Sequence, residues 1–294
     1  MSEIVSLTNV TKLYGDTIAL HKVTLQIEKG EIFGLVGGNG AGKSTMLKLI
    51  CGMVLPTAGE VSVKDRTATS LASIVEEPTL HVEHSAMNNL KIHARLLGLA
   101  QNEEYFAKTI ELVGLNPLSK AKVKSFSLGM KQRLAIAVAL LCKPELLILD
   151  EPMNGLDPQG ILELRELLLN LNARGVTIII SSHILAELEK LATKYCFVEK
   201  GKVIKIVTME EICQESENNT RILVNDAVLA IKALNDNGFV AKILSSKEIL
   251  VKGEQKLSQM VSIFETVGVS VESFSVEAQS VEQYFLKLIG GQSK

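Results

Sequence analysis

The chain has 294 residues, a net charge of −2 and 47% hydrophobic residues, a composition typical of a folded globular protein long enough for two domains. No apolar run reaches the roughly 18 residues needed to span a bilayer, and the N-terminus lacks the basic and apolar segments of a signal peptide, so we expect a cytoplasmic protein. The near-neutral charge and the 4% aromatic content argue against nucleic acid as a partner.

The first quarter of the chain is rich in strand signals. Residues 4–27 alternate apolar and polar side chains around a turn at Gly15, which predicts an antiparallel hairpin. A short apolar strand follows at Ile32–Val36, and a glycine-rich loop leads from it into a helical pattern over residues 43–50. Two further short strands are predicted at residues 60–63 and 71–75.

The next part, residues 85–142, shows mostly helical periodicity. Residues 87–97 and 103–113 carry apolar side chains at i, i+3 and i+4, and each segment is followed by a glycine that suits a helix end. Residues 130–142 are apolar on nearly all sides after the first turn, which predicts a buried helix.

Strands and helices then alternate over residues 146–208. The predicted elements are strands at Leu146–Leu149, 176–181 and 195–198, with helices at 158–171 and 185–192. Continuous apolar strands separated by helices indicate a parallel sheet covered on both faces. The fold class expected is therefore α/β.

A polar run at residues 214–220 marks a domain boundary. Beyond it, residues 221–289 are predicted to form strand, helix, strand, strand, helix, strand and helix in that order. This is a small α+β module, and a ferredoxin-like βαββαβ unit is one arrangement compatible with the order.

The first motif that carries chemistry is a glycine-rich loop between a strand and a helix. It reads Gly37-Gly38-Asn39-Gly40-Ala41-Gly42-Lys43-Ser44 and matches G-x-x-x-x-G-K-[ST] in full. Glycines allow backbone N–H groups and the positive helix end to point at the β- and γ-phosphates of ATP. Lys43 supplies a full charge, the Ser44 hydroxyl is a hard oxygen ligand for Mg²⁺, and Thr45 can bond the α-phosphate.

The second motif is a pair of carboxylates after a buried strand. Leu146–Leu149 delivers Asp150 and Glu151 at its carboxyl end, where ligands of open α/β sheets bind. We expect Asp150 to hold Mg²⁺, and Glu151 to polarise the attacking water as the general base. Together the two motifs predict an ATPase that uses Mg²⁺.

A third segment lies just before the second motif and reads Phe126-Ser127-Leu128-Gly129-Met130-Lys131-Gln132-Arg133. With it, the chain resembles the nucleotide-binding subunit of an ABC transporter over residues 1 to about 212. The resemblance implies a P-loop ATPase domain at residues 1–213, with a mixed sheet core, an antiparallel β part and a helical subdomain at about 85–142. Residues 221–290 are then an accessory α+β domain.

The resemblance also assigns roles to three isolated side chains. It implies that Tyr14 stacks on adenine, that Asp157 lies in a loop crossing a dimer interface, and that His183 senses the γ-phosphate. Each residue also has an ordinary alternative, such as surface packing for Tyr14 and a structural role for His183. Their order and spacing favour the functional interpretation.

The third segment has its own physical chemistry. Ser127 is a good helix N-cap, and its hydroxyl with the Gly129 N–H can point along the positive end of the following helix. In the family this end binds the γ-phosphate of ATP held by the opposite subunit, which implies a head-to-tail homodimer. Leu128 and Met130 stand where the family usually has glycine and glutamine. The alternative is a capped core helix with no contact in trans.

Two further positions depart from the family pattern. Glu76 aligns with a glutamine that the family uses to contact Mg²⁺ and the attacking water, and it adds a negative charge near the γ-phosphate. The expected metal ligands are therefore Ser44, Glu76 and Asp150, with a solvated acidic turn as the alternative for Glu76. Gly38 stands where proline is common, and its extra freedom predicts slightly weaker nucleotide binding.

Glu76 and the third segment resemble the corresponding residues in one branch of ABC transporters. That branch contains bacitracin-type and lantibiotic-protection exporters. This resemblance implies ATP hydrolysis by Lys43, Glu151 and His183, coupled to export of antimicrobial peptides through a separate transmembrane permease. The chain would sit on the inner face of the cell membrane through that permease only. Two alternatives are a soluble ABC ATPase acting on ribosomes or DNA, and a regulatory module that binds ATP without turnover.

Overall fold

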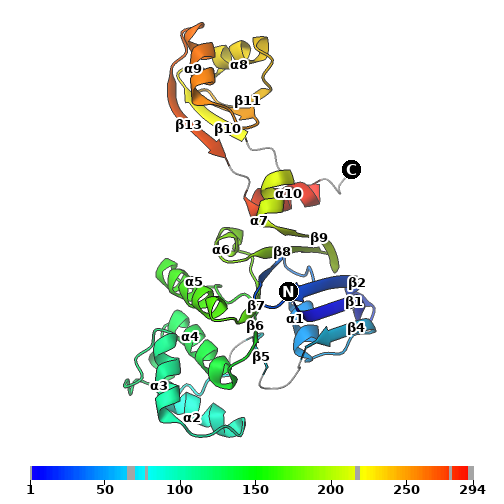
Figure 1. Ribbon diagram of the computed structural model, residues 1–294, viewed down its shortest axis with the longest axis vertical. Helices are drawn as coiled ribbons and strands as arrows, with labels where there is room; N and C mark the ends of the chain where they lie inside the picture. The colour runs from blue at the N-terminus through cyan, green and yellow to red at the C-terminus, as the bar shows by residue number, and fades with distance from the viewer. Residues whose placement is uncertain (1, 65–69, 77–78, 216–218, 278–279, 291–294) are drawn as a thin grey trace. The chain divides into compact units, whose positions relative to one another are not determined.

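The computed structural model describes residues 2–64, 70–76, 79–215, 219–277 and 280–290 (Figure 1). The chain divides into two compact units, one up to Val207 and one from Thr208 onwards. The first unit contains two sheets and the second contains one, and each unit has its own buried core.

The centre of the first unit is a six-stranded sheet. Its strands, in the order in which they lie side by side, are β5 (Leu71–Ile74), β6 (Leu146–Leu149), β7 (Thr177–Ser181), β3 (Ile32–Val36), β8 (Lys194–Glu199) and β9 (Lys202–Thr208). The pairs from β5 through to β8 are all parallel, so their carboxyl ends meet at one edge. Strands β3, β6 and β7 are buried along their whole length, as continuous apolar runs require.

A second, antiparallel sheet lies beside the first. Its order is β2 (Thr17–Glu28), β1 (Glu3–Tyr14) and β4 (Ala58–Val63), and helix α1 (Lys43–Cys51) follows β3 in the chain. Side chains of both sheets and of α1 form one apolar core, which includes Leu7, Leu25, Phe33, Met46 and Ile148. This core fixes the start of α1 against the carboxyl end of β3.

Helices α2, α3 and α4 pack against one another at one end of the first unit (Figure 1). The helices of this unit after α1 are α2 (Ala86–Leu96), α3 (Glu103–Leu112), α4 (Leu128–Ala139), α5 (Pro158–Ala173) and α6 (Leu185–Glu189), with 3-10 turns η1 (Val123–Ser125) and η2 (Leu140–Cys142). Four of them start at a side-chain N-cap, which is Ser85, Asn102, Ser127 and Asp157 in turn. The cap at Ser127 explains why α4 begins earlier than the expected residue 130.

The second unit is an antiparallel sheet with helices. Its elements are α7 (Met209–Glu215), β10 (Asn219–Val224), α8 (Ala227–Asp236), β11 (Ala241–Ser245), β12 (Glu248–Lys252), α9 (Leu257–Glu265), β13 (Val271–Glu277) and α10 (Val281–Gly290). The sheet order β11-β12-β10-β13 is the split βαβ arrangement. Its core includes Ile222, Leu234, Ile249, Met260 and Phe264.

Helix α7 was missed at the sequence level, and it lies in the second unit. A capping box starts it, because Thr208 Oγ1 accepts from Glu211 N (3.2 Å) and Glu211 Oε2 accepts from Thr208 N (2.7 Å). The Tyr284 hydroxyl donates to Glu215 Oε2 (2.6 Å) and so joins α10 to α7. The boundary predicted at residue 213 therefore differs from the division after Val207.

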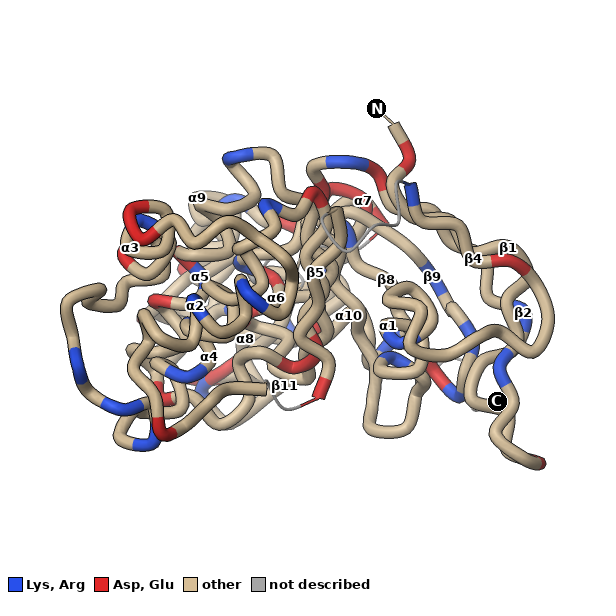
Figure 2. The backbone as a smooth tube through the Cα atoms, turned by 90° about the horizontal axis from the view of Figure 1, so that it is seen from below, with Lys and Arg blue, Asp and Glu red and all other residues tan. Residues whose placement is uncertain are grey.

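Charge is distributed evenly over the described residues. Figure 2 shows Lys, Arg, Asp and Glu interspersed along the backbone, with both signs close together in many places. Among the same residues, no helix combines the length and the apolar character that a membrane span requires. The predicted absence of a nucleic-acid partner stays a prediction.

Candidate functional site

The glycine-rich loop turns back on itself directly after β3. Gly40 and Gly42 have positive φ angles of 75° and 108°, which favour glycine. A Cβ on Gly37 would lie 2.4 Å from the Val198 carbonyl oxygen, and one on Gly42 would lie 2.8 Å from the Ala19 carbonyl oxygen. The loop is thus held against β8 and β2 so closely that only glycine fits at these positions.

Lys43 begins α1 and folds back over this loop. Its Nζ donates to the carbonyl oxygens of Gly37 (2.7 Å) and Gly38 (3.3 Å), and its side chain is only 7% exposed. The same Nζ lies 3.6 Å from Glu151 Oε1. The buried ammonium group of Lys43 therefore lies between the carbonyl oxygens of the loop and the carboxylate of Glu151, which follows β6.

The carboxylates after β6 are bound to residues at the end of β7. Ser181 Oγ donates to Asp150 Oδ1 (2.6 Å) and accepts from the backbone N of Glu151 (2.8 Å). Glu151 Oε2 accepts from the backbone N of His183 (3.1 Å) and pairs with His183 Nδ1 (2.7 Å). Because β6, β7 and β3 are parallel neighbours, Lys43, Asp150, Glu151 and His183 come together at one edge of the sheet.

Ser181 is a residue that sequence reasoning missed. It was expected only as the last residue of a strand, yet its buried hydroxyl bridges the carboxylate of Asp150 and the backbone N of Glu151. A polar side chain that ends an otherwise apolar strand was the signal available in the sequence. The contact also supports an unusual backbone, since Glu151 has a φ of 49° although it is not glycine.

Two of the expected metal ligands, Ser44 and Asp150, carry oxygen donors of the kind that Mg²⁺ prefers. Within the described part of the chain, no group of three or more His, Cys, Asp or Glu residues could hold a metal alone. Mg²⁺ usually binds one or two carboxylates together with substrate phosphates. The exposed hydroxyl of Ser44 on α1 and the carboxylate of Asp150 are donors of this kind, so they fit Mg²⁺ that binds with ATP.

Glu76 has a contact that the sequence did not predict. Its Oε1 bonds Lys48 Nζ on α1 (2.5 Å), and this hydrogen bond lowers the pKa of the Glu76 carboxyl and raises that of Lys48. Its backbone φ is 71°, again in the left-handed region. The ligand role expected for Glu76 stays a prediction, and Lys48 is the second residue that sequence reasoning missed.

The segment from Ser127 to Met130 forms the start of α4, with Ser127 Oγ accepting from Met130 N (3.2 Å). Leu128 is exposed, and it lies near Gly155, where an added Cβ would be 3.1 Å from Leu128 Cδ2. Asp157 caps α5, because its Oδ1 accepts from Gly160 N (3.0 Å). These residues therefore form a second cluster, built from two helix starts.

Tyr14 ends β1 and is partly exposed. Lys12 Nζ lies 4.9 Å from the centre of its ring, a distance that allows a cation–π interaction. The ring is thus held at the surface beside a cation. Its predicted role in adenine stacking stays a prediction.

Comparison with known proteins identifies the family of this chain. The family model described as ABC transporter matches residues 20–154. The bacitracin transport ATP-binding protein BcrA of Bacillus licheniformis is 34% identical over 99% of both chains. The chain belongs to the ABC transporter family. The lantibiotic transport ATP-binding protein SrtF of Streptococcus pyogenes is 42% identical, over 76% of this chain and 96% of that protein.

A solved structure of an ABC transporter cassette supports the same conclusion. It is described as the dimeric, post-hydrolysis state of an ATP-binding cassette bound to ADP and Pi. It is 26% identical, with a TM-score of 0.62 over 70% of this chain and 98% of that chain. The expected family and the α/β fold of an ABC ATPase are confirmed, and this ABC subunit is an ATPase.

Replacing Ser181 with alanine tests the link between the Asp150 carboxylate and the Glu151 backbone of this ABC subunit. The backbone N of Glu151 loses its partner, so we expect about 1–3 kcal/mol lower stability and roughly tenfold slower ATP hydrolysis. Unfolding by denaturant and steady-state ATPase assays measure the two effects. Ser62→Ala, at an exposed serine of β4, should change neither; unaltered hydrolysis in Ser181→Ala would show that Ser181 does not position the carboxylates.

Proposed function

We propose that this chain is the ATP-hydrolysing subunit of an exporter that moves antimicrobial peptides, of the bacitracin or lantibiotic kind, through a separate permease. The observation that carries the proposal is the 34% identity to a bacitracin transport ATP-binding protein over 99% of both chains. That match includes the second unit, which we propose as an accessory domain. The lantibiotic transport relative matches 76% of this chain.

The first cluster supplies the chemistry of hydrolysis. We propose that ATP binds to Tyr14 and to the loop from Gly37 to Thr45, where Lys43 binds the β- and γ-phosphates. Mg²⁺ bound by Ser44 and Asp150, with Glu76 as the expected third ligand, would draw negative charge from those phosphates. A protein group must then accept the proton of the attacking water.

Glu151 is the group proposed to accept that proton. His183 holds its Oε2 at 2.7 Å, and Ser181 holds its backbone N at 2.8 Å, so the carboxylate is oriented before water arrives. Lys43 Nζ, at 3.6 Å from Oε1, places a positive charge beside the carboxylate. His183 is also proposed to sense the γ-phosphate.

The second cluster is proposed to complete the site of another copy. Ser127, Leu128, Gly129 and Met130 form the positive end of α4, an arrangement that favours a phosphate. ABC ATP-binding subunits form dimers, as in the dimeric cassette structure. We propose that two copies bind head to tail, with Asp157 in the loop between them.

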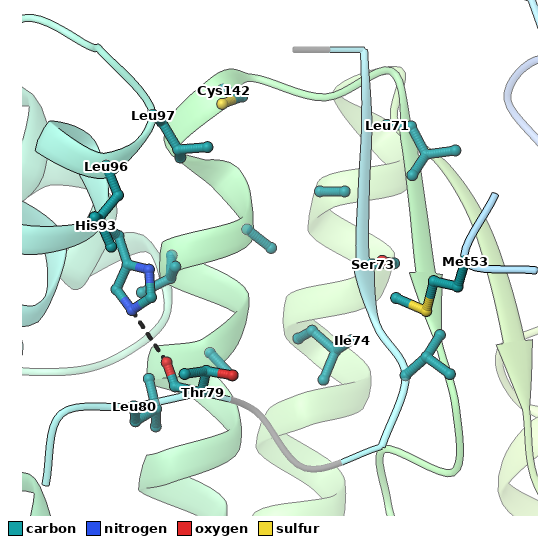
Figure 3. A pocket seen from close by; sticks show the side chains of 15 residues that line it. Met53, Leu71, Ser73, Ile74, Thr79, Leu80, His93, Leu96, Leu97 and Cys142 are labelled. Carbon is teal, nitrogen blue, oxygen red and sulfur yellow. Dashed lines mark hydrogen bonds between the residues drawn. The ribbon is translucent and has the colours of Figure 1, made fainter. Parts of the chain in front are cut away.

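An apolar groove offers a contact surface for the permease (Figure 3). It has a volume of about 390 Å³ and is lined by residues of β5, α2 and α4 and of the segments beside them, among them Met53, Leu71, Ile74, Leu97 and Val138. At its rim Leu96 is 74% exposed, and exposed apolar grooves of this kind suit protein partners. We propose that the permease docks here and holds the chain on the inner face of the membrane.

Purification from membranes tests the proposed function. Isolating the tagged chain with its permease and reconstituting the complex in vesicles should give an ATPase that bacitracin or a lantibiotic stimulates several-fold. An unrelated linear peptide of equal charge serves as the control. Turnover that no peptide changes would reject peptide export, and no turnover in the complete complex would favour a regulatory module that only binds ATP.

A further inference from the structure

Lys48 lies one turn beyond Ser44 on α1, so both side chains face the same side of the helix. Its ammonium group bonds Glu76 Oε1 at 2.5 Å, and its side chain is 29% exposed. It is also close enough to Asp150 for the charge of that carboxylate to act on it. Lys48 therefore lies among the groups proposed to bind ATP and Mg²⁺.

Glu76 reaches Lys48 from the edge of the central sheet. It follows β5, whose last residue, Ile74, accepts a hydrogen bond from the backbone N of Asp150 (2.9 Å). The Glu76 side chain is 70% exposed, and one of its carboxylate oxygens bonds Lys48 on α1. Exposed ion pairs contribute little to the stability of the fold. The importance of this pair therefore lies in its position beside the proposed ATP site.

When ATP binds at the proposed site, several negative charges come close together around Glu76. The β- and γ-phosphates, Asp150 and Glu151 are all negative, and Lys43 is the cation already in contact with the loop. A carboxylate at position 76 adds one more negative charge that like charges would repel. Lys48 contributes the matching positive charge from the face of α1 that also carries Ser44.

We propose that Lys48 is a positioning residue that neutralises Glu76 and so makes a carboxylate at this position compatible with Mg²⁺ and ATP. The inference rests on the proposed ATP site and adds a residue to it. Under this proposal, nucleotide binding depends on Lys48 only while residue 76 carries a negative charge. A lysine that bound phosphate directly would be needed with either residue at position 76.

Equilibrium binding of a non-hydrolysable ATP analogue with Mg²⁺ to the isolated full chain tests this dependence. Lys48→Met should raise Kd on the order of tenfold, whereas the same change in a Glu76→Gln background should raise it less than about threefold. Lys48→Arg should bind like the wild type because it keeps the charge. Lys29→Met, at the exposed Lys29–Glu145 pair (2.8 Å), is the matched control and should leave Kd unchanged.

The outcomes separate this inference from the function on which it rests. An equal loss of affinity with Glu or Gln at position 76, or no loss in either, overturns the role of Lys48 alone. A wild-type chain that bound no nucleotide would overturn both the proposed site and this inference. Unfolding midpoints measured for each variant show that changes in Kd do not come from misfolding.

Discussion

Replacing Glu151 with glutamine is expected to lower the rate of ATP hydrolysis roughly 100- to 10,000-fold, the usual contribution of a general base. Glutamine has nearly the same shape and can still contact His183, but it cannot accept a proton from water. Lys43 keeps its bonds to the loop carbonyl oxygens, so nucleotide affinity should stay close to that of the wild type. Single-turnover hydrolysis and equilibrium binding measure the two quantities separately.

A matched control is available on helix α5. Glu166 is an exposed glutamate outside the site, and Glu166→Gln should retain full hydrolysis. The assignment of Glu151 as general base is wrong if Glu151→Gln hydrolyses ATP within about tenfold of the wild type, because a lost base costs more than that. Equal loss of binding and hydrolysis would instead indicate a damaged site.

Gly37→Ala is expected to weaken nucleotide binding at least about tenfold and to lower stability by about 1–3 kcal/mol, the range for a side chain forced into a packed site. Its Cβ would be 2.4 Å from the carbonyl oxygen of Val198, which lies on the buried strand β8. Backbone in a central strand cannot move away as a flexible side chain could. The loop must therefore leave the position in which its N–H groups are proposed to face the phosphates.

The neighbouring glycine provides the comparison. A Cβ on Gly38 would meet nothing within 4 Å, and Gly38 is not among the glycines with positive φ. Gly38→Ala should therefore fold normally and gain about 0.4–1 kcal/mol of stability from a less flexible unfolded chain. Calorimetry and nucleotide titration of both variants are the measurements. Similar behaviour of the two alanines would contradict the loop geometry described here.

Much of the site could be predicted because its elements are encoded locally. The strand at Leu146–Leu149 has the bounds that its apolar run indicates, and α1 starts at Lys43 as the loop motif requires. Asp150 and Glu151 follow from the first of these patterns, because a buried strand ends where ligands bind. Helix α10 likewise starts at Val281 as its periodicity predicts.

The residues that were missed make contacts between segments distant in the chain. Ser181 meets Asp150 because β7 lies beside β6, and Lys48 meets Glu76 because β5 lies near α1, but neither pairing leaves a local pattern. Helix α7 is different, since the Thr208–Glu211 capping box was present in the sequence and was not used. Predicting such long-range contacts requires the order of the strands in the sheet, and the spacing of residues along the sequence does not give that order.

The left-handed backbone at Glu151 sets a trade-off between stability and activity. A φ of 49° at a non-glycine residue costs on the order of 1–3 kcal/mol, and two hydrogen bonds offset it, one from the Glu151 backbone N to Ser181 Oγ and one from the His183 backbone N to Glu151 Oε2. Glycine would adopt this backbone without strain, yet it would remove the carboxylate proposed to accept the proton from water. Stability alone would therefore favour glycine at position 151, whereas the proposed general base requires glutamate there.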